Sequence, residues 1–131
     1  MSDQTRQLIS SGGPWEAAGG YSRAVRVGSQ IAIAGTVAVH DGEVVAPGDV
    51  YEQTKFILEL FADVLTEAGA SLGDVVRTRS FITDISQWEG FSRAHGETFG
   101  EIRPAATLVE VSGLLGDGTV IEIEADAIAP S

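Results

Sequence analysis

The sequence contains no cysteine, and only two of its 131 residues are histidines, His40 and His95. A chain without thiols cannot form a disulfide, a thiolate zinc site or a cysteine nucleophile. Two imidazoles also argue against a histidine-rich metal site. The thiol-based classes of enzyme are therefore excluded at the outset.

Basic residues are scarce too: 8 Lys and Arg stand against 19 Asp and Glu, which gives a formal net charge of −11. A negative field repels phosphate backbones and anionic headgroups, so we expect no nucleic-acid or membrane partner. No apolar run approaches the roughly 20 residues that span a bilayer. Residues 1–6 lack the basic start and apolar stretch of a signal peptide. We therefore expect a soluble, cytoplasmic protein.

The length predicts one domain, residues 1–131, which buries roughly two-thirds of the surface of its unfolded chain. Residues 1–20 are polar and glycine-rich, and they are expected to form a loop-like lead-in. There is no linker and no internal repeat. A chain of this size can hold one core, but it leaves little room for a deep pocket of its own.

Several segments have the composition of β-strands. Apolar runs at residues 24–27 and 31–34 flank a glycine-containing turn and predict a hairpin. A third strand is expected around Asp41-Gly42, a pair that suits a tight turn with positive φ. Further strands are predicted at the segments 74–83, 106–111 and 120–129.

Two segments have helical periodicity. Apolar residues recur every three or four positions over residues 50–68, with Asp49 as the capping residue and Gly69 as the terminator. A second helix, ending near Phe99, is expected to open with a Ser86–Glu89 capping box. The order βββαβαββ predicts an α+β fold with two helices on one face of a mostly antiparallel sheet. The other face then needs a cover, which we expect from further copies of the chain.

The last predicted strand carries the most distinctive polar pattern. Glu122, Glu124 and Asp126 alternate with apolar residues, so all three carboxylates share one face. Arg77 and Arg79 share one face of the strand at 74–83, and neighbouring strands would form an Arg/Glu ladder. The preferred interpretation is a solvated, salt-bridged face; the alternative is a cleft carboxylate that transfers protons or activates water.

The histidines are interpreted structurally. His95 lies on the apolar stripe of the second helix, where a packed and hydrogen-bonded histidine is expected rather than a ligand-binding one. His40, next to Asp41-Gly42, is expected to be an exposed turn residue.

Three segments carry a resemblance to a known family: Gly-Tyr-Ser-Arg-Ala-Val at 20–25, Arg-Pro-Ala-Ala-Thr-Leu-Val-Glu-Val at 103–111, and Ile-Glu-Ile-Glu-Ala at 121–125. In order and spacing they resemble the YjgF/RidA family of reactive intermediate deaminases. The resemblance implies a chorismate-mutase-like fold and a homotrimer with small-molecule sites between subunits. It also implies hydrolysis of 2-imino acids and their enamine tautomers to 2-keto acids and ammonia, with no metal and no organic cofactor.

The resemblance also implies site residues. Tyr21 corresponds to a tyrosine of the site, and Glu122 corresponds to the glutamate that positions water. The family's Ser-Gly pair corresponds to Ala34-Gly35, and its helix asparagine corresponds to Ser92.

The arginine that holds the substrate carboxylate corresponds to Ala106, so the sequence resembles a branch without that anchor. Loss of such a pair costs about 2–5 kcal/mol, or roughly 30-fold to several thousand-fold in binding. We therefore expect weak or altered imine hydrolysis. The alternatives are a working 2-iminobutanoate or 2-iminopropanoate deaminase anchored by Arg79 or Arg103, a non-enzymatic regulatory or chaperone-like binding protein, and an endoribonuclease, which fits the negative charge poorly.

Overall fold

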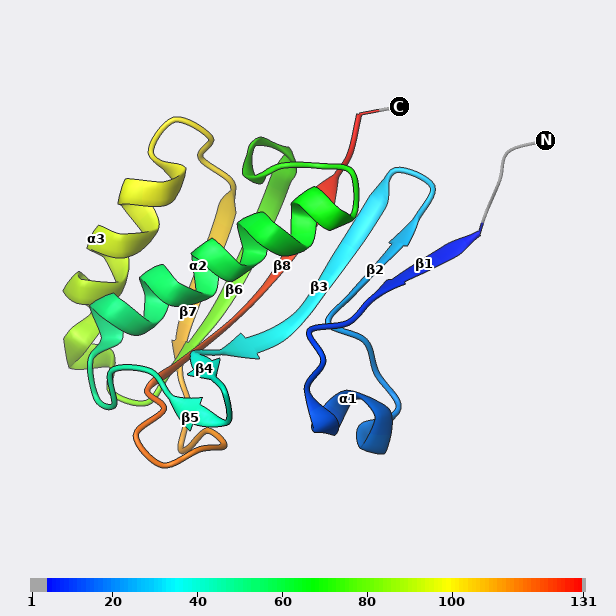
Figure 1. The fold of residues 1–131 in the computed structure, drawn as a ribbon. Coiled ribbons are helices and arrows are strands. Elements are labelled where there is room, and N and C mark those ends of the chain that lie inside the picture. The colour runs from blue at the N-terminus through cyan, green and yellow to red at the C-terminus, as the bar shows by residue number, and fades with distance from the viewer. Residues whose placement is uncertain (1–4, 131) are drawn as a thin grey trace.

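A six-stranded sheet with the strand order β1-β2-β3-β8-β6-β7 organises the computed structural model, which describes residues 5–130 (Figure 1). All neighbouring strands are antiparallel except β6 and β7, which are parallel and joined through a helix. A separate two-stranded ribbon pairs β4 with β5. The strands are β1 (Arg6–Ile9), β2 (Ala24–Val27), β3 (Gln30–Val37), β4 (Val39–His40), β5 (Glu43–Val44), β6 (Val75–Ile82), β7 (Ala105–Glu110) and β8 (Ile121–Ile128).

Helices α2 (Val50–Glu67) and α3 (Trp88–Phe99) lie on one face of this sheet, as predicted (Figure 1). Asp49 Oδ1 accepts a hydrogen bond from the Glu52 backbone N–H at 3.0 Å, which caps the start of α2. Gly69 follows its end with φ 84°, the left-handed conformation expected of a helix terminator. Within residues 5–130, no helix is both long and apolar enough to cross a membrane.

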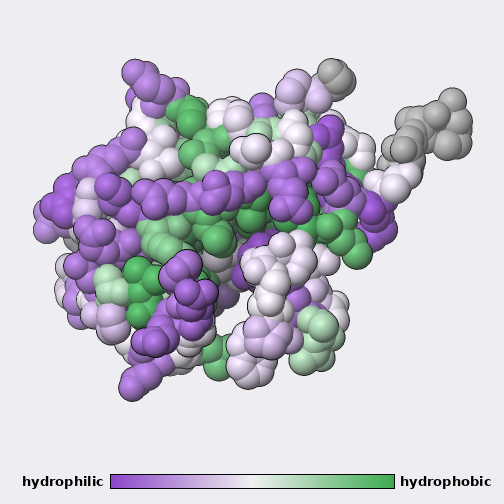
Figure 2. Space-filling model, in the orientation of Figure 1, coloured by the Kyte–Doolittle hydropathy of each residue, from purple (hydrophilic) through white to green (hydrophobic). Residues whose placement is uncertain are grey.

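The core lies between the sheet and the two helices. Ile121 and Ile123 of β8 are fully buried on the helix side, and Phe61 of α2 is buried against the same core. The intervening residues of β8 are only half-buried, so the strand alternates between a core face and an open face. Figure 2 shows the hydrophilic outer surface of α2 above more hydrophobic side chains.

One buried polar side chain ties the connections at one end of the sheet to α2. Gln53 is fully buried, and its Nε2 donates to the carbonyls of Val45, Ala46 and Gly118. Its Oε1 accepts a hydrogen bond from the Val120 backbone N–H. The side chain thereby holds the β4–β5 ribbon and the approach to β8 against the helix.

The prediction of a loop-like lead-in is wrong for the described part of that segment, because it contains β1 and a short helix, α1 (Pro14–Gly19). The Pro and Gly residues that were interpreted as loop formers occupy helix ends instead. Pro14 takes the first turn, and Gly20 ends the helix with φ 74°. The expectation that the chain does not begin with a signal peptide rests mostly on residues 1–4, which lie outside the described residues.

Two further details differ from prediction. The expected third strand forms the separate β4–β5 ribbon, with Asp41 and Gly42 at positive φ in its turn, while β1 supplies the main sheet's first strand. The predicted Ser86–Glu89 capping box is absent: Asp84 caps a 3₁₀ turn, η2 (Ile85–Gln87), that leads directly into α3. A second 3₁₀ turn, η1 (Leu72–Asp74), precedes β6. The order βββαβαββ of the main sheet and long helices is nevertheless confirmed.

Candidate active site

The open face of β8 carries the predicted row of carboxylates. β6 pairs with β8, and Arg79 lies opposite Glu124 in the register. Its Nη1 contacts Glu124 at 3.4 Å and Asp126 at 3.2 Å. The predicted Arg/Glu ladder is thus confirmed for Arg79, whose half-exposed partners make it a surface ion-pair network. Arg77, the other predicted member, is in no ion pair within residues 5–130.

Glu122 has different surroundings from the other two carboxylates. It is half-buried, and its Oε2 lies only 2.5 Å from the position that a Cβ on Gly35 would take. Burial raises the pKa of Glu122, the nearby charge of Arg23 lowers it, and Glu124 raises it again, with a net increase. A carboxylate whose pKa is moved upward is better suited to accept and return a proton near neutral pH.

Arg23 is a residue that sequence reasoning missed, although it lies within one of the segments that carry the family resemblance. It immediately precedes β2, and its side chain is only 9% exposed. Its Nε has no hydrogen-bond partner. The ion pairs within 4 Å in residues 5–130 involve His40 and Arg79, so Arg23 has no direct ionic partner there. The available signal was a charged residue directly before a strand, within a segment that carries the family resemblance.

Tyr21 lies next to this arginine. The Arg23 guanidinium carbon lies 5.6 Å from the centre of the Tyr21 ring, within the range of a cation–π contact. A Cβ on Gly19 would lie 3.1 Å from two carbons of the ring, so the glycine gives the ring room. The tyrosine is 45% exposed and is accessible to a small molecule.

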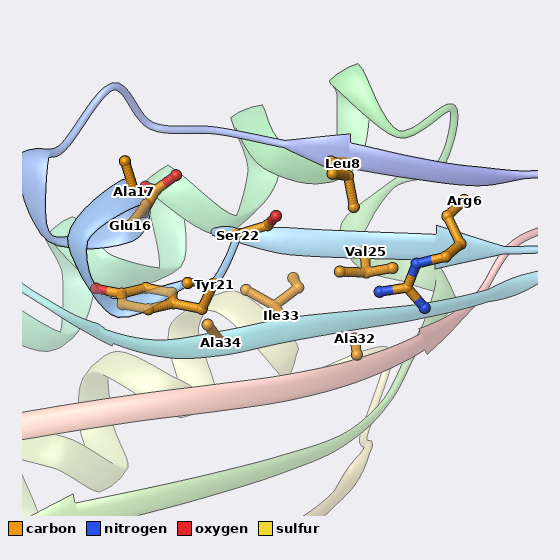
Figure 3. A pocket seen from close by; sticks show the side chains of 11 residues that line it. Arg6, Leu8, Glu16, Ala17, Tyr21, Ser22, Val25, Ala32, Ile33 and Ala34 are labelled. Atoms are coloured by element: carbon orange, nitrogen blue, oxygen red, sulfur yellow. The ribbon is translucent and has the colours of Figure 1, made fainter.

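A groove of about 620 Å³ runs along β1, β2 and β3 from α1 (Figure 3). Tyr21 and Ala34 lie at one of its ends, and Arg6 and Ala32 lie towards the other. Glu122 is not part of its lining, so the groove reaches the predicted site only through Tyr21 and Ala34. α1 forms a lobe of its own beside it (Figure 2).

Glu16 of α1 is a second carboxylate at this end of the groove. It is buried and accepts hydrogen bonds from the backbone N–H and the hydroxyl of Ser11. Burial raises its pKa. The hydrogen bonds from Ser11 and Ser10 and the charge of Arg23 together lower the pKa by more than burial raises it, so the net shift is downward. Glu16 is therefore a permanent negative charge near Arg23.

Other predicted site residues do not meet Glu122 within one chain. Ala106 of β7 pairs in register with Thr78, whose hydroxyl faces α3, so Ala106 belongs to the helix side of the sheet. Ser92 is an exposed residue of α3 itself. Arg103 is exposed in the α3–β7 connection, where it has φ 58°. Within one chain, Glu122 lies against Gly35, Ala34 is adjacent in sequence, and Tyr21 is connected to Glu122 through Arg23. Arg79 shares the open face but contacts Glu124 and Asp126 instead.

Both histidine interpretations are confirmed. His95 Nε2 lies 2.9 Å from the Thr78 hydroxyl, and its ring packs between Phe91 and Phe99. Burial lowers the pKa of His95. His40 is exposed at the end of β4, directly before the Asp41-Gly42 turn. In the described part of the chain, no three His, Asp or Glu side chains are grouped so as to hold a metal ion.

Comparisons with known proteins agree with this architecture. A family model described as Endoribonuclease L-PSP matches residues 13–129. A RutC family protein of Pyrococcus abyssi is 42% identical over 111 residues, covering 83% of this chain and 86% of that protein. A protein of Acinetobacter baylyi named 3-aminoacrylate deaminase RutC is 32% identical over 104 residues, covering 79% of this chain and 82% of that protein.

Among solved structures, a Mycobacterium tuberculosis protein described as a member of the YjgF/YER057c/UK114 family has a TM-score of 0.87 at 43% identity. The match covers 95% of this chain and 100% of that chain. The family model spans most of the sequence, and the fold matches as well. The chain therefore belongs to the YjgF/RidA family.

Proposed function

We propose that this protein binds small imine or enamine metabolites and hydrolyses them with weak or altered activity, using Glu122 to position and deprotonate water. The observation that carries the proposal is the placement of Glu122, half-buried against Gly35 with its pKa raised. The name 3-aminoacrylate deaminase of the Acinetobacter relative supports an enamine or imine as the class of substrate.

The proposed reaction needs only water and a proton acceptor. Water oxygen bonds to the carbon of the C=N group while the Glu122 carboxylate takes a proton from that water. That proton then passes to nitrogen and gives a tetrahedral intermediate with a hydroxyl and an amino group. Glu122 next transfers the hydroxyl proton to the amino nitrogen, the C–N bond breaks, and ammonia leaves behind a carbonyl. Tyr21 and the backbone of Ala34 and Gly35 would line the site and orient the substrate.

The altered activity follows from position 106, where alanine stands in place of the family's anchoring arginine. Arg79 is a poor substitute, because Glu124 and Asp126 already contact its guanidinium. Arg103 lies in the exposed connection after α3, and residues 5–130 supply no carboxylate within 4 Å that fixes its side chain. The proposed substrate is therefore not held at position 106.

A homotrimer is part of the same proposal. Glu122 lies on the open face of the sheet, whereas Ala106 and Ser92 lie on the helix side, so a second chain is needed to bring such positions together. Sites between subunits of a cytoplasmic trimer would meet that need. The endoribonuclease activity in the family model's description is not proposed, since a net charge of −11 opposes RNA binding.

The first test measures release of ammonia and 2-oxobutanoate from 2-iminobutanoate generated in situ, above the uncatalysed rate. We expect Glu122→Gln to abolish the catalysed rate, and the wild-type rate to fall as pH decreases through the raised pKa of Glu122, because only the carboxylate accepts a proton. Glu124→Gln is the matched control, since it changes the same group on the same face; its rate should stay within about threefold.

Ala106→Arg tests the altered specificity in the same assay. A restored anchor should raise kcat/KM for 2-iminobutanoate by about 30-fold or more. Wild-type turnover equal to that of the arginine variant would contradict the altered-activity part of the proposal. Full activity in Glu122→Gln would contradict the assigned chemistry.

A further inference from the structure

We infer that Arg23 binds the carboxylate of an anionic imine or enamine in this protein, the role that position 106 cannot fill. The inference deepens the proposed function and rests on it for the identity of the reacting group. It assigns a substrate-binding residue on the opposite side of the sheet from Ala106.

The first observation is a buried guanidinium with unused donors. Arg23 is 9% exposed, its Nε has no hydrogen-bond partner, and no carboxylate within residues 5–130 lies within 4 Å of it. Burial of a charge without a direct partner is costly, so such a group is retained where something else offsets its charge. Arginine offers five N–H donors in a planar fork that matches a carboxylate.

The second observation is the position of Arg23 relative to the reacting groups. The Ala34 backbone N–H donates to the Arg23 carbonyl at 2.9 Å, so Arg23, directly before β2, lies beside Ala34 of β3. Ala34 precedes Gly35, against which the Glu122 carboxylate lies. The open face of the sheet therefore carries three neighbouring positions on adjacent strands: Arg23, then Gly35, then Glu122.

The third observation concerns access. Tyr21 lies under the guanidinium and also lines the groove of about 620 Å³, together with Ala34 and Glu16. Arg23 and Glu122 are not part of the lining, so a small molecule at this end of the groove would meet the Tyr21 ring directly and reach the Arg23 guanidinium past that ring. Figure 3 shows Tyr21 and Ala34 side by side at this end.

The charges around Arg23 fit a bound anion that sits close to Glu122. The hydrogen bonds from Ser11 stabilise the negative charge of the Glu16 carboxylate. This charge attracts the Arg23 guanidinium without a direct contact. Arg23 lowers the pKa of Glu122 against the effect of burial. A substrate carboxylate on Arg23 would offset that influence, so Glu122 would become a stronger base once substrate is bound.

The test compares two imines generated in situ: 2-iminobutanoate, and propan-1-imine, which has no carboxylate. We expect Arg23→Gln to lower kcat/KM for 2-iminobutanoate by about 30-fold or more, and by at least about tenfold more than for propan-1-imine. Arg23→Lys should give an intermediate loss, because it keeps the charge but not the fork. Arg93→Gln, which removes the same charge from the exposed side of α3, is the control.

An equal loss on both imines in Arg23→Gln would overturn the inference, because it would indicate a structural role or an effect on Glu122 alone. If Arg23→Gln does not fold, the same comparison is made with Arg23→Lys, and an equal loss on both imines again overturns the inference.

A binding measurement separates this inference from the proposed function. Calorimetry with 2-oxobutanoate, which carries the carboxylate but does not react, should show at least tenfold weaker binding to Arg23→Gln than to the wild type. Unchanged binding overturns the role of Arg23 whatever the turnover. Wild-type turnover in Glu122→Gln, together with weakened binding in Arg23→Gln, would refute the proposed chemistry and leave the carboxylate site supported.

Discussion

At the scale of single residues, the absence of a side chain at Gly35 determines where the Glu122 carboxylate can lie. Glu122 comes from β8 and Gly35 from β3, and the two meet close to an irregularity in the pairing of these strands. Any other residue at position 35 would place a Cβ 2.5 Å from the present position of Oε2, so the Glu122 carboxylate would have to move. Glycine at this position therefore allows the carboxylate to lie where it does.

We expect Gly35→Ala to lower the catalysed rate of imine hydrolysis by about 100-fold, because a carboxylate displaced by about 1 Å no longer directs the water correctly. The rate is measured with 2-iminobutanoate, and the fold is monitored by circular dichroism. An activity within threefold of the wild type would contradict the proposed position of Glu122.

Gly96→Ala is the matched control for this substitution. Gly96 lies inside α3, and a Cβ there would meet nothing within 4 Å. Alanine at an open helical position is expected to leave the rate unchanged and to raise the free energy of unfolding by roughly 0.5–1 kcal/mol.

At the scale of secondary-structure elements, a hydrogen bond between Thr78 and His95 helps to dock α3 on β6. Thr78 is fully buried, and His95 is held between two phenylalanine rings of its own helix. We expect Thr78→Val to lower the free energy of unfolding by about 1–3 kcal/mol, because it leaves the imidazole nitrogen buried without its partner. Urea denaturation at neutral pH measures this change, and an unchanged midpoint would contradict it.

The same histidine makes the stability depend on pH. Burial lowers the pKa of His95 in the folded state, so the unfolded chain binds a proton more readily. The stability contributed by neutral His95 is fully present above the pKa of histidine in the unfolded chain, which is about 6.5. It is lost as the pH falls below that value towards the lowered pKa of the folded state. In His95→Gln, the decrease in unfolding free energy between pH 7 and pH 5 should be smaller than in the wild type.

At the scale of the whole molecule, the sheet has one face covered by α2 and α3 and one face without a layer of its own (Figure 1). The proposed site residues are divided between these two sides. This division is the physical reason to expect that several chains complete the site together.

We expect sedimentation equilibrium to give a mass of about three times the 13.7 kDa of one chain. Arg93→Gln, which removes an exposed charge of α3 and its contact with the Tyr51 ring of α2, should sediment as the wild type does. A mass near that of one chain at micromolar concentration would contradict the proposed trimer.

The helices and most strands were predictable from the sequence because their signals are local. The spacing of apolar residues in the α2 segment, the cap at Asp49 and the terminator at Gly69 are all signals that lie between positions 49 and 69. The short N-terminal elements were missed because β1 is only four residues long and is stabilised by pairing with β2. The capping box at the start of α3 was wrongly predicted because Asp84 acts as the cap and accepts hydrogen bonds from both the backbone N–H and the hydroxyl of Ser86.

By itself, the sequence determined the family, the order of the main elements and the shared face of Glu122, Glu124 and Asp126, because periodicity and motif spacing are properties of the chain alone. Only the tertiary structure separated Glu122, against Gly35, from the two carboxylates that contact Arg79. It also revealed the buried side chain of Arg23 beside Tyr21, which is in no ion pair within residues 5–130. Burial and the distance between strands remote in sequence decide whether a charge is solvated or confined, and neither can be read from spacing along one strand.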